Sequence, residues 1–507
     1  MFTASETSII SLTVLVALGI LGWGFYRARR FGKLGILAWL QSVVLMAPWL
    51  LFFGLFATGI YINLAGVLLL LVSSTVVYVY LGNRLRAAGG DAVLRAKATE
   101  RLDSSNSQTA ESPDRAVKPA SEKLKIEVVP PIPDEDLNAI RGIFGIDTFF
   151  ATETIPYQEG VIFKGNLRGE PDTVYDRLNA SLQKRLGVSE AAPQEPRYRL
   201  FLVENAEGKP VFIVLPSSND PRPSSLSQKI FAAVLFVATI ATSLETGGLI
   251  QGFDVFTAPT RYQEAIPIAL GILAVLVAHE IGHRVLAQRY QVRLSPPFFL
   301  PTLQIGAFGA ITKIESLLPN RKVLFDIALA GPAAGGIVSL LMLLAGLILS
   351  HPGSLFQVPS QFFSGSILVG TLSKIVLGSA VNQPLVDVHP LTVIGWLGLV
   401  ITALNLMPAG QLDGGRIVQA VYGRKTAGRT TIATVIVLGI ASFANPLALY
   451  WAVVILFLQR DLERPSLNEL TEPDDARAAL ALLALFLTIA TLLPITPALA
   501  GRLGIGG

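Results

Sequence analysis

The chain has 507 residues, of which 51% are hydrophobic and 15% charged, and its mean hydropathy is +0.56. Apolar residues are over-represented and charges scarce relative to soluble proteins, so we expect a membrane protein that crosses the bilayer several times. The absence of cysteine excludes disulfides, thiolate metal sites and a cysteine nucleophile, which leaves His, Asp and Glu as the strong metal ligands. The net charge of +4 is small, and basic residues lie beside apolar segments, which indicates membrane topology and no binding of nucleic acid.

Apolar runs begin near the N-terminus. A helix that crosses the bilayer core needs about 20 predominantly apolar residues. Three such runs, at 8–26, 36–58 and 62–82, predict an N-terminal three-helix membrane block over 1–83. No basic region precedes the first run, and no long leader rich in Ser and Arg is present, so we expect neither a signal peptide nor a transit peptide.

The next segment has two parts. Residues 84–123 are rich in Ala, Ser and charges and poor in aromatics, which predicts a flexible linker. Residues 124–220 predict a small α+β domain. PDEDLNAIRGIFG and TVYDRLNASLQKRLG have helical spacing, and YRLFLVENAEGKPVFIVLP indicates a hairpin that turns at Glu207 and Gly208.

Seven further apolar runs follow, which gives about ten membrane helices in total. The two short runs beside Pro446 could form a helical hairpin or one bent element. The final run belongs to a C-terminal segment, 461–507, with a cytoplasmic loop and one helix. The seven runs are 229–245, 265–286, 323–349, 389–408, 430–443, 446–459 and 478–497.

Lys and Arg follow the positive-inside rule along these runs. With the N-terminus outside, basic residues collect in the interior loops, whereas the exterior loops and the C-terminus hold only Arg261, Lys374 and Arg502. The α+β domain is therefore expected to be cytoplasmic. The predicted fold is a polytopic α-helical membrane protein of about ten transmembrane helices, with a small cytoplasmic α+β domain inserted before the membrane core.

The sequence AHEIGHR lies at the end of the run 265–286. His279 and His283 are four positions apart, so a helix presents both imidazoles on one face, with Glu280 beside them. HExxH is the spacing of zinc metalloproteases, in which the two His bind the metal and the Glu is the general base. A packed pair of histidines is the structural alternative, but an ionisable cluster within a membrane indicates function.

A catalytic zinc usually takes three protein ligands. The other histidines, His351 and His389, fall on the exterior side of the predicted topology, whereas His279 lies toward the interior end of its helix. Asp413, in NLMPAGQLDGGR, follows a helix that runs inward, and it reaches the same depth. Asp413 is therefore the predicted third ligand, and a turn aspartate before two glycines is the alternative.

These motifs resemble the site-2 protease, or M50, family of intramembrane zinc metalloproteases. GNLRGE at 165–170 further resembles the EGY branch of plant plastids and cyanobacteria, and the resemblance covers roughly 130–460. It makes 228–460 the protease core. It also implies one Zn²⁺ per chain, held by the residues already singled out, with Glu280 as the catalytic base and His279, His283 and Asp413 as the metal ligands.

Residues near the site are expected to bind the substrate. Residues 295–316 carry Pro and Gly between apolar residues, which suits a re-entrant loop or hairpin, or else an ordinary interfacial loop. The resemblance favours the hairpin, with Gly306 and Gly309 at the substrate. It gives Asn405 a role in holding the substrate or the oxyanion, and packing is the alternative. AGPAAGG at 330–336 predicts close helix contact.

The expected activity is that of an intramembrane zinc endopeptidase that cuts single-span membrane proteins in the lipid bilayer. A non-proteolytic membrane chaperone or scaffold of the same fold is the alternative, and the presence of all four motif residues argues against it. A zinc transporter would string polar groups along a path, whereas these converge. We expect the protein to lie in the plasma or thylakoid membrane of a bacterium, namely a cyanobacterium. Arg168 and Glu170 of GNLRGE either bind a partner or pair at a turn, and the turn is favoured.

Overall fold

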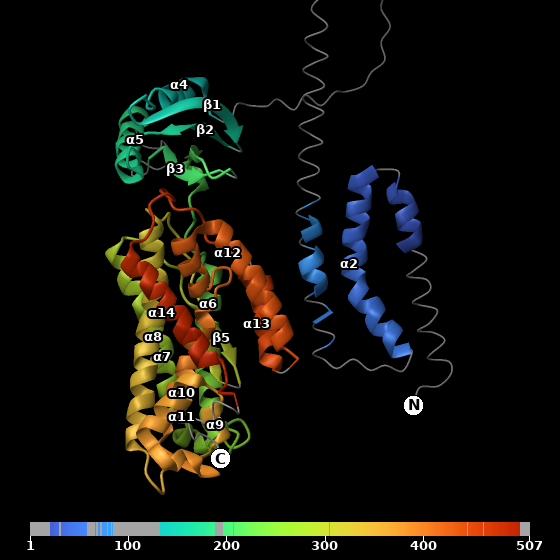
Figure 1. The fold of residues 1–507 in the computed structure, drawn as a ribbon, viewed down its shortest axis with the longest axis vertical. Helices are drawn as coiled ribbons and strands as arrows, with labels where there is room; N and C mark the ends of the chain where they lie inside the picture. Colours follow the sequence, from blue (N-terminus) through green and yellow to red (C-terminus); the bar gives the residue numbers. More distant parts are fainter. Residues whose placement is uncertain are drawn as a thin grey trace, which may run out of the picture. The chain divides into compact units, whose positions relative to one another are not determined.

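The computed structural model (Figure 1) describes most of the chain after residue 131 and part of the N-terminal region. Its described positions fall into two compact units, one within 1–127 and 435–458 and the other within 128–434 and 459–507. The described residues are 21–29, 32–57, 66, 69–70, 73–78, 80–82, 84, 132–157, 159–187, 196–205, 207–303, 305–443, 445–459 and 461–496.

The first unit contains apolar helices. α2 spans Gly32–Ala57 and includes Pro48, and it confirms a helix at the run 36–58. α13 spans Pro446–Leu458. Two predicted segments, 8–26 and 84–123, fall mostly outside the described residues, and 62–82 falls partly outside them.

The second unit begins with a small α+β domain, whose four strands form one antiparallel sheet in the order β1-β2-β4-β3. α4 and α5 pack on this sheet (Figure 1). Both helices and the hairpin β3–β4, which turns at Gly208 with φ of 77°, confirm the sequence prediction. The strands are β1 (Phe149–Tyr157), β2 (Gly160–Leu167), β3 (Tyr198–Glu204) and β4 (Pro210–Pro216), and the helices are α4 (Asp134–Arg141) and α5 (Pro171–Leu186).

Apolar spacing explains how α5 meets the sheet. Val174, Leu178 and Leu182 recur every four positions and are buried, so one face of the helix covers the sheet. Pro171 occupies the first turn, where its missing N–H is not needed, and Gly187 ends the helix with φ of 65°.

GNLRGE forms the end of β2 and the turn from β2 to α5. Gly165 faces a bulge in β1, and a Cβ on it would lie 2.1 Å from the backbone O of Phe150. Gly169 has φ of 101°, which favours glycine. These two glycines therefore have a structural explanation, although Arg168 and Glu170 form no ion pair with each other among the described contacts.

The core of the α+β domain is rich in phenylalanine. Phe149 and Phe212 are fully buried, and their rings meet edge to face with centroids 4.8 Å apart. Phe212→Ala leaves a cavity here and is expected to destabilise the domain by about 3–5 kcal/mol. Amide hydrogen exchange within the domain of the full-length protein measures this loss.

Phe150→Ala is the matched control for that variant. Phe150 lies in the same sheet but is 47% exposed, so its removal is expected to lower the free energy of opening by less than about 1 kcal/mol. Equal losses in the two variants would contradict this description of the core.

Long apolar helices build the rest of the second unit. Among the described residues, four helical segments are long and apolar enough to cross a membrane. They confirm apolar helices at four of the predicted runs, while the total of about ten stays a prediction. The four are α6 (Leu226–Ile250), α7 (Tyr262–Arg289), α8 (Arg321–Leu349) and α14 (Asp475–Leu492).

Two further helices position the site. α11 (Pro390–Asn405) packs along α8 and confirms a helix at the run 389–408, although its 16 residues are fewer than predicted. α12 (Asp413–Ala441) is divided by Gly423, whose φ of 80° is not helical. The sequence predicts only the second part of α12, at 430–443. Because α12 ends before α13 begins, the two runs beside Pro446 form two helices.

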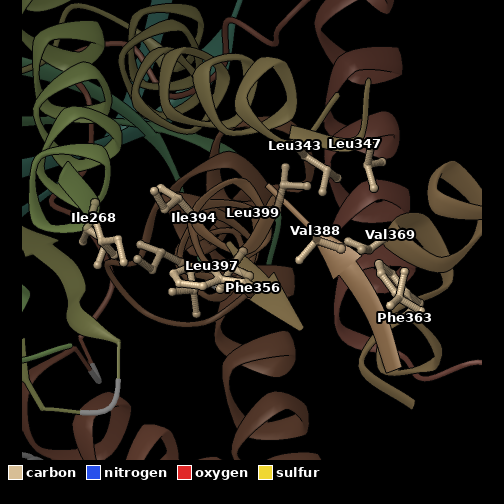
Figure 2. Close-up of a cluster of buried hydrophobic side chains, with 14 of the residues drawn as sticks. Ile268, Leu343, Leu347, Phe356, Phe363, Val369, Val388, Ile394, Leu397 and Leu399 are labelled. Carbon is tan, nitrogen blue, oxygen red and sulfur yellow. The ribbon is translucent and has the colours of Figure 1, made fainter. Parts of the chain in front are cut away.

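Short elements between α8 and α11 complete the apolar core. The strands β7 and β8 pair antiparallel. Figure 2 shows Phe356 of β7, Phe363 of α9 and Val388 of β8 in one buried cluster with Leu343 of α8 and Ile394 of α11. The sequence predicts none of these short elements, which are β7 (Phe356–Pro359), α9 (Gln361–Ser364), α10 (Ile367–Leu377) and β8 (Leu385–Val388).

Candidate metal centre

α7 carries HEIGH on a buried face. His279, Glu280 and His283 are 8%, 7% and 4% exposed, whereas Ile281 on the opposite face is 53% exposed. The Nε2 atoms of the two histidines lie 3.1 Å apart. The expectation that one helix face presents both imidazoles is therefore confirmed.

Asp413 reaches the histidines as the first residue of α12. Its Oδ2 lies 3.1 Å from Nε2 of His279 and 3.4 Å from Nε2 of His283. The turn before α12 is tight, because a Cβ on Gly414 would lie 1.9 Å from the backbone O of Leu406. Asp413 thus lies at a glycine turn, and that turn directs its carboxylate to the two imidazoles.

The three donor atoms fit a tetrahedral zinc ion. Zinc binds imidazole nitrogen and carboxylate oxygen at about 2.0–2.2 Å, so two ligands of one tetrahedral ion lie about 3.3 Å apart. The separations of 3.1, 3.1 and 3.4 Å agree with this geometry. Within the described residues, this is the one group of three His, Asp or Glu side chains whose ligand atoms converge.

A backbone carbonyl fixes the tautomer of His283. Its Nδ1 lies 2.7 Å from the backbone O of Ile327 on α8, so Nδ1 carries the proton and Nε2 can bind a metal. The two other histidines lie elsewhere, as expected. His351 is exposed, and Nδ1 of His389 accepts the N–H of Leu391 at the start of α11.

AGPAAGG gives α8 the close contact with α7 that its small residues predict. A Cβ on Gly282 of α7 would lie 2.3 Å from the backbone O of Ala330. A Cβ on Gly331 would lie 2.2 Å from Nε2 of His283. Gly331 therefore leaves the space that the His283 ring occupies.

Gly331→Ala is expected to lower the affinity for zinc about ten- to a hundredfold, because the new methyl group must displace the His283 ring. Zinc content after dialysis against graded concentrations of a chelator measures the change. Gly336→Ala is the matched control, since its Cβ would meet Thr402 at an ordinary 3.5 Å. Equal retention of zinc in the two variants would contradict the packing described here.

Glu280 has a hydrogen bond at one carboxylate oxygen and an ion pair at the other. The hydroxyl of Thr312 donates to Oε2 at 2.9 Å, and Nη2 of Arg284 lies 2.9 Å from Oε1. Arg284 also donates to the backbone O of Ser295. Neither contact is among the predictions from the sequence. The Arg284 contact has a local signal, because residues four apart on a helix face each other, whereas Thr312 has none.

A β-hairpin lies beside the site. β5 (Phe298–Thr302) and β6 (Gly306–Ile311) pair antiparallel, which confirms the hairpin over an ordinary interfacial loop. Gly306 and Gly309 have φ of 84° and 115°, a region that favours glycine. Thr242 of α6 donates to the backbone O of Gly306 at 2.6 Å and so ties the hairpin to α6.

Asn405 joins α11 to this hairpin. Its Nδ2 donates to the backbone O of Phe308 at 3.2 Å and to that of Ile401 at 2.8 Å. A Cβ on Gly309 would lie 2.5 Å from the same nitrogen. Asn405 thus makes the packing contacts of the alternative interpretation. A contact between Asn405 and the substrate stays a prediction.

Two cavities meet at Glu280. The small inner cavity is lined by His279, Glu280, Gly309 and Asn405, while Gly306 is not among its lining residues. The outer cavity, of about 410 Å³, opens between α6, α7 and the start of β5. Glu280 and Phe299 line both cavities, so they separate the inner space from the outer one.

Comparisons with known proteins agree with this site. Residues 267–444 match Peptidase family M50, and residues 138–221 match the EGY3 middle domain. "Probable zinc metalloprotease EGY1, chloroplastic" of Arabidopsis thaliana is 38% identical over 401 residues, which cover 72% of each chain. The EGY2 protein of the same plant is 37% identical over 73% of this chain and 67% of its own.

A rice relative gives the same result. EGY1 of Oryza sativa subsp. japonica is 35% identical over 73% of this chain and 69% of its own, and it too is named a probable zinc metalloprotease. No solved structure matches the chain. The matched residues include HEIGH and the LDGG turn, which supply the converging His and Asp side chains. The chain therefore belongs to the M50, or site-2 protease, family of zinc metalloproteases, in its EGY branch.

Proposed function

We propose that the chain is an intramembrane zinc endopeptidase that hydrolyses peptide bonds in or near the transmembrane segments of single-span membrane proteins. One observation carries this proposal: two His and one Asp converge at tetrahedral separations within a group of apolar helices, with a buried Glu beside them. Membership of the M50 family supports the same activity.

His279, His283 and Asp413 would hold the zinc ion. When bound, the ion supplies a Lewis acid that polarises the scissile carbonyl and lowers the pKa of water toward neutrality. The buried position of the ligands in the structure strengthens these electrostatic interactions. Three protein ligands leave a position open for water or substrate, as in other catalytic zinc sites.

Glu280 is the proposed general base. It takes a proton from the attacking water and later delivers it to the leaving amine. The Thr312 hydroxyl orients its Oε2, and Arg284 lies against its Oε1. Arg284 and Glu280 both line the outer cavity, which is the proposed route for water to the buried carboxylate.

The hairpin is the proposed site for the substrate backbone. A transmembrane helix hides its peptide bonds in internal hydrogen bonds, so it must unwind before hydrolysis. In the structure the backbone O of Phe308 on β6 accepts the Asn405 amide beside the inner cavity. We expect an N–H of an unwound substrate to replace that donor, which frees Asn405 to hold the substrate carbonyl. The positive φ angles of Gly306 and Gly309 determine the course of β6 at this edge of the hairpin.

The identity of the membrane and the orientation of the chain in it are also part of the proposal. The relatives are named chloroplastic, and we propose a thylakoid or bacterial plasma membrane for this chain. The distribution of Lys and Arg supports a cytoplasmic, or equivalent interior, side for the α+β domain. The ten apolar runs of the sequence support about ten spans in all.

Reconstitution tests the proposal. The purified chain in liposomes is incubated with a panel of single-span proteins, and mass spectrometry maps each cut. We expect cuts within or beside the spans, loss of cutting with a zinc chelator, and recovery when zinc is restored. Binding of these proteins without any cut, in zinc-loaded and folded protein, would support the scaffold alternative instead.

A further inference from the structure

A segment between α13 and α14 links the α+β domain to the metal centre. We call residues 461–471 the strap. On its outer part, the backbone O of Leu467 accepts the N–H of Leu202 at 2.8 Å, and the N–H of Glu469 donates to the backbone O of Leu202 at 2.9 Å. Leu467 and Leu470 pack into the core of the α+β domain. The strap therefore adds to the free edge of β3.

The same segment is anchored to the protease core and to α5. The N–H groups of Leu467 and Asn468 donate to the backbone O atoms of Leu318 and Pro319, at 2.8 and 3.0 Å. The Asn468 side chain donates to Asp172, in the first turn of α5, at 2.9 Å. Thr471 donates to the same carboxylate. The outer part of the strap is thus held from both sides.

The inner part of the strap buries a carboxylate. Glu463 is 6% exposed, and its Oε2 lies 3.1 Å from Nε and 3.0 Å from Nη2 of Arg416, which is also 6% exposed. Gln419 and Arg424 of α12 donate to the backbone O of Glu463. A buried ion pair is costly to desolvate and does not by itself indicate stabilisation. Stability alone therefore does not explain why Glu463 and Arg416 are buried here.

Arg416 contacts the metal centre directly. Its Nη1 lies 3.8 Å from Oδ1 of Asp413, the carboxylate oxygen that does not face the histidines. Its Nη2 donates to the backbone O of Thr312 at 2.8 Å. The hydroxyl of the same Thr312 donates to Glu280. One guanidinium therefore forms an ion pair with a metal ligand and a hydrogen bond to the residue that orients the base.

We propose that Arg416 and Glu463 are positioning residues of the active site, and that the strap, anchored on the α+β domain, supplies Glu463. The α+β domain then contributes to catalysis without touching the substrate. The kinetic part of this inference rests on the proposed function. The metal part does not, because it concerns how firmly Asp413 is held.

Glu463→Gln tests the inference. The variant keeps the side-chain volume and removes the charge that orients Arg416. We expect zinc to leave for a chelator about tenfold faster, a change typical of residues that orient metal ligands. We expect kcat for a single-span substrate to fall about tenfold, with KM within about twofold, because the reacting groups and not the binding surface are displaced.

Glu472→Gln is the matched control. Glu472 lies just after the strap and pairs with Arg321 at 3.3 Å, but its side chain is 73% exposed. It is expected to match the wild type in zinc release and kcat. If Glu463→Gln cannot be recovered folded, Arg416→Lys, which keeps the charge but loses the forked contact, is expected to show the same two changes.

Asp172→Ala extends the test to the α+β domain. Removing the anchor for Asn468 is expected to lower kcat in the same direction as Glu463→Gln, by about two- to fivefold. Combined with Glu463→Gln it should add nothing further. Wild-type zinc release and kcat in Glu463→Gln, or full additivity in the double variant, would overturn the inference. A wild type that cuts nothing would overturn the proposed function, while zinc release would still decide the role of the strap.

Discussion

Glu280→Gln is expected to abolish cleavage, by at least about a thousandfold, while zinc stays bound. The amide has nearly the size of the carboxylate, but it cannot accept the water proton. Glu280 is 7% exposed and contacts Thr312 and Arg284 rather than the ligand atoms, so its replacement leaves the donor set intact. Initial rates of cleavage and zinc content, measured on the same liposome preparation, check both parts.

The control for that variant lies on the same helix. Glu264 of α7 is exposed and pairs with Arg261 at 2.7 Å, far from the ligand atoms in sequence, and Glu264→Gln is expected to cut at the wild-type rate. Cleavage by Glu280→Gln at a rate near that of Glu264→Gln would remove Glu280 from the mechanism.

Asp413→Ala is expected to lose both zinc and cleavage. The variant removes one of three converging donors, and two imidazoles alone hold zinc far more weakly. We expect zinc content to fall from about one per chain to near zero at a chelator concentration that leaves the wild type loaded. Elemental analysis of the dialysed protein measures it.

Asp176→Ala controls for the general effect of losing a carboxylate. Asp176 is exposed on α5, so its removal is expected to leave zinc content unchanged. Full zinc content in Asp413→Ala would show that another side chain completes the site, and the assignment of Asp413 would then be wrong.

The sequence is most informative where a short spacing determines geometry. HExxH on a helix places two imidazoles on one face, and the structure has them 3.1 Å apart. Asp413 lies far along the chain, yet it was predictable from the direction of the helix before it. The first prediction depends on the repeat of the α-helix, and the second on the direction in which one helix crosses the membrane. Neither needs the packing of particular side chains.

The supporting residues could not be predicted in that way. Thr312 reaches Glu280 across 32 positions, and Arg416 reaches Thr312 across 104. No local pattern marks such contacts, because they arise only when β6, α7 and α12 come together. Glu463 looks like an ordinary loop acid in the sequence, and only its burial in the structure distinguishes it.

The fold shows the same division. Long apolar runs predicted α6, α7, α8 and α14, because about 20 apolar residues are a strong signal. β7 and β8 have four residues each and α10 has 11, which is too short for periodicity to be clear. Their burial comes from packing on α8 and α11, as in Figure 2, so tertiary contacts decide their structure.

The most direct test of the central claim is X-ray absorption at the zinc edge of the purified, full-length protein. We predict one zinc per chain with two imidazole nitrogens and oxygen donors at about 2.0–2.2 Å, and loss of one imidazole or of the metal in His283→Ala. Folded protein without zinc, or a spectrum that His283→Ala leaves unchanged, would contradict the claim that His279, His283 and Asp413 form the metal centre.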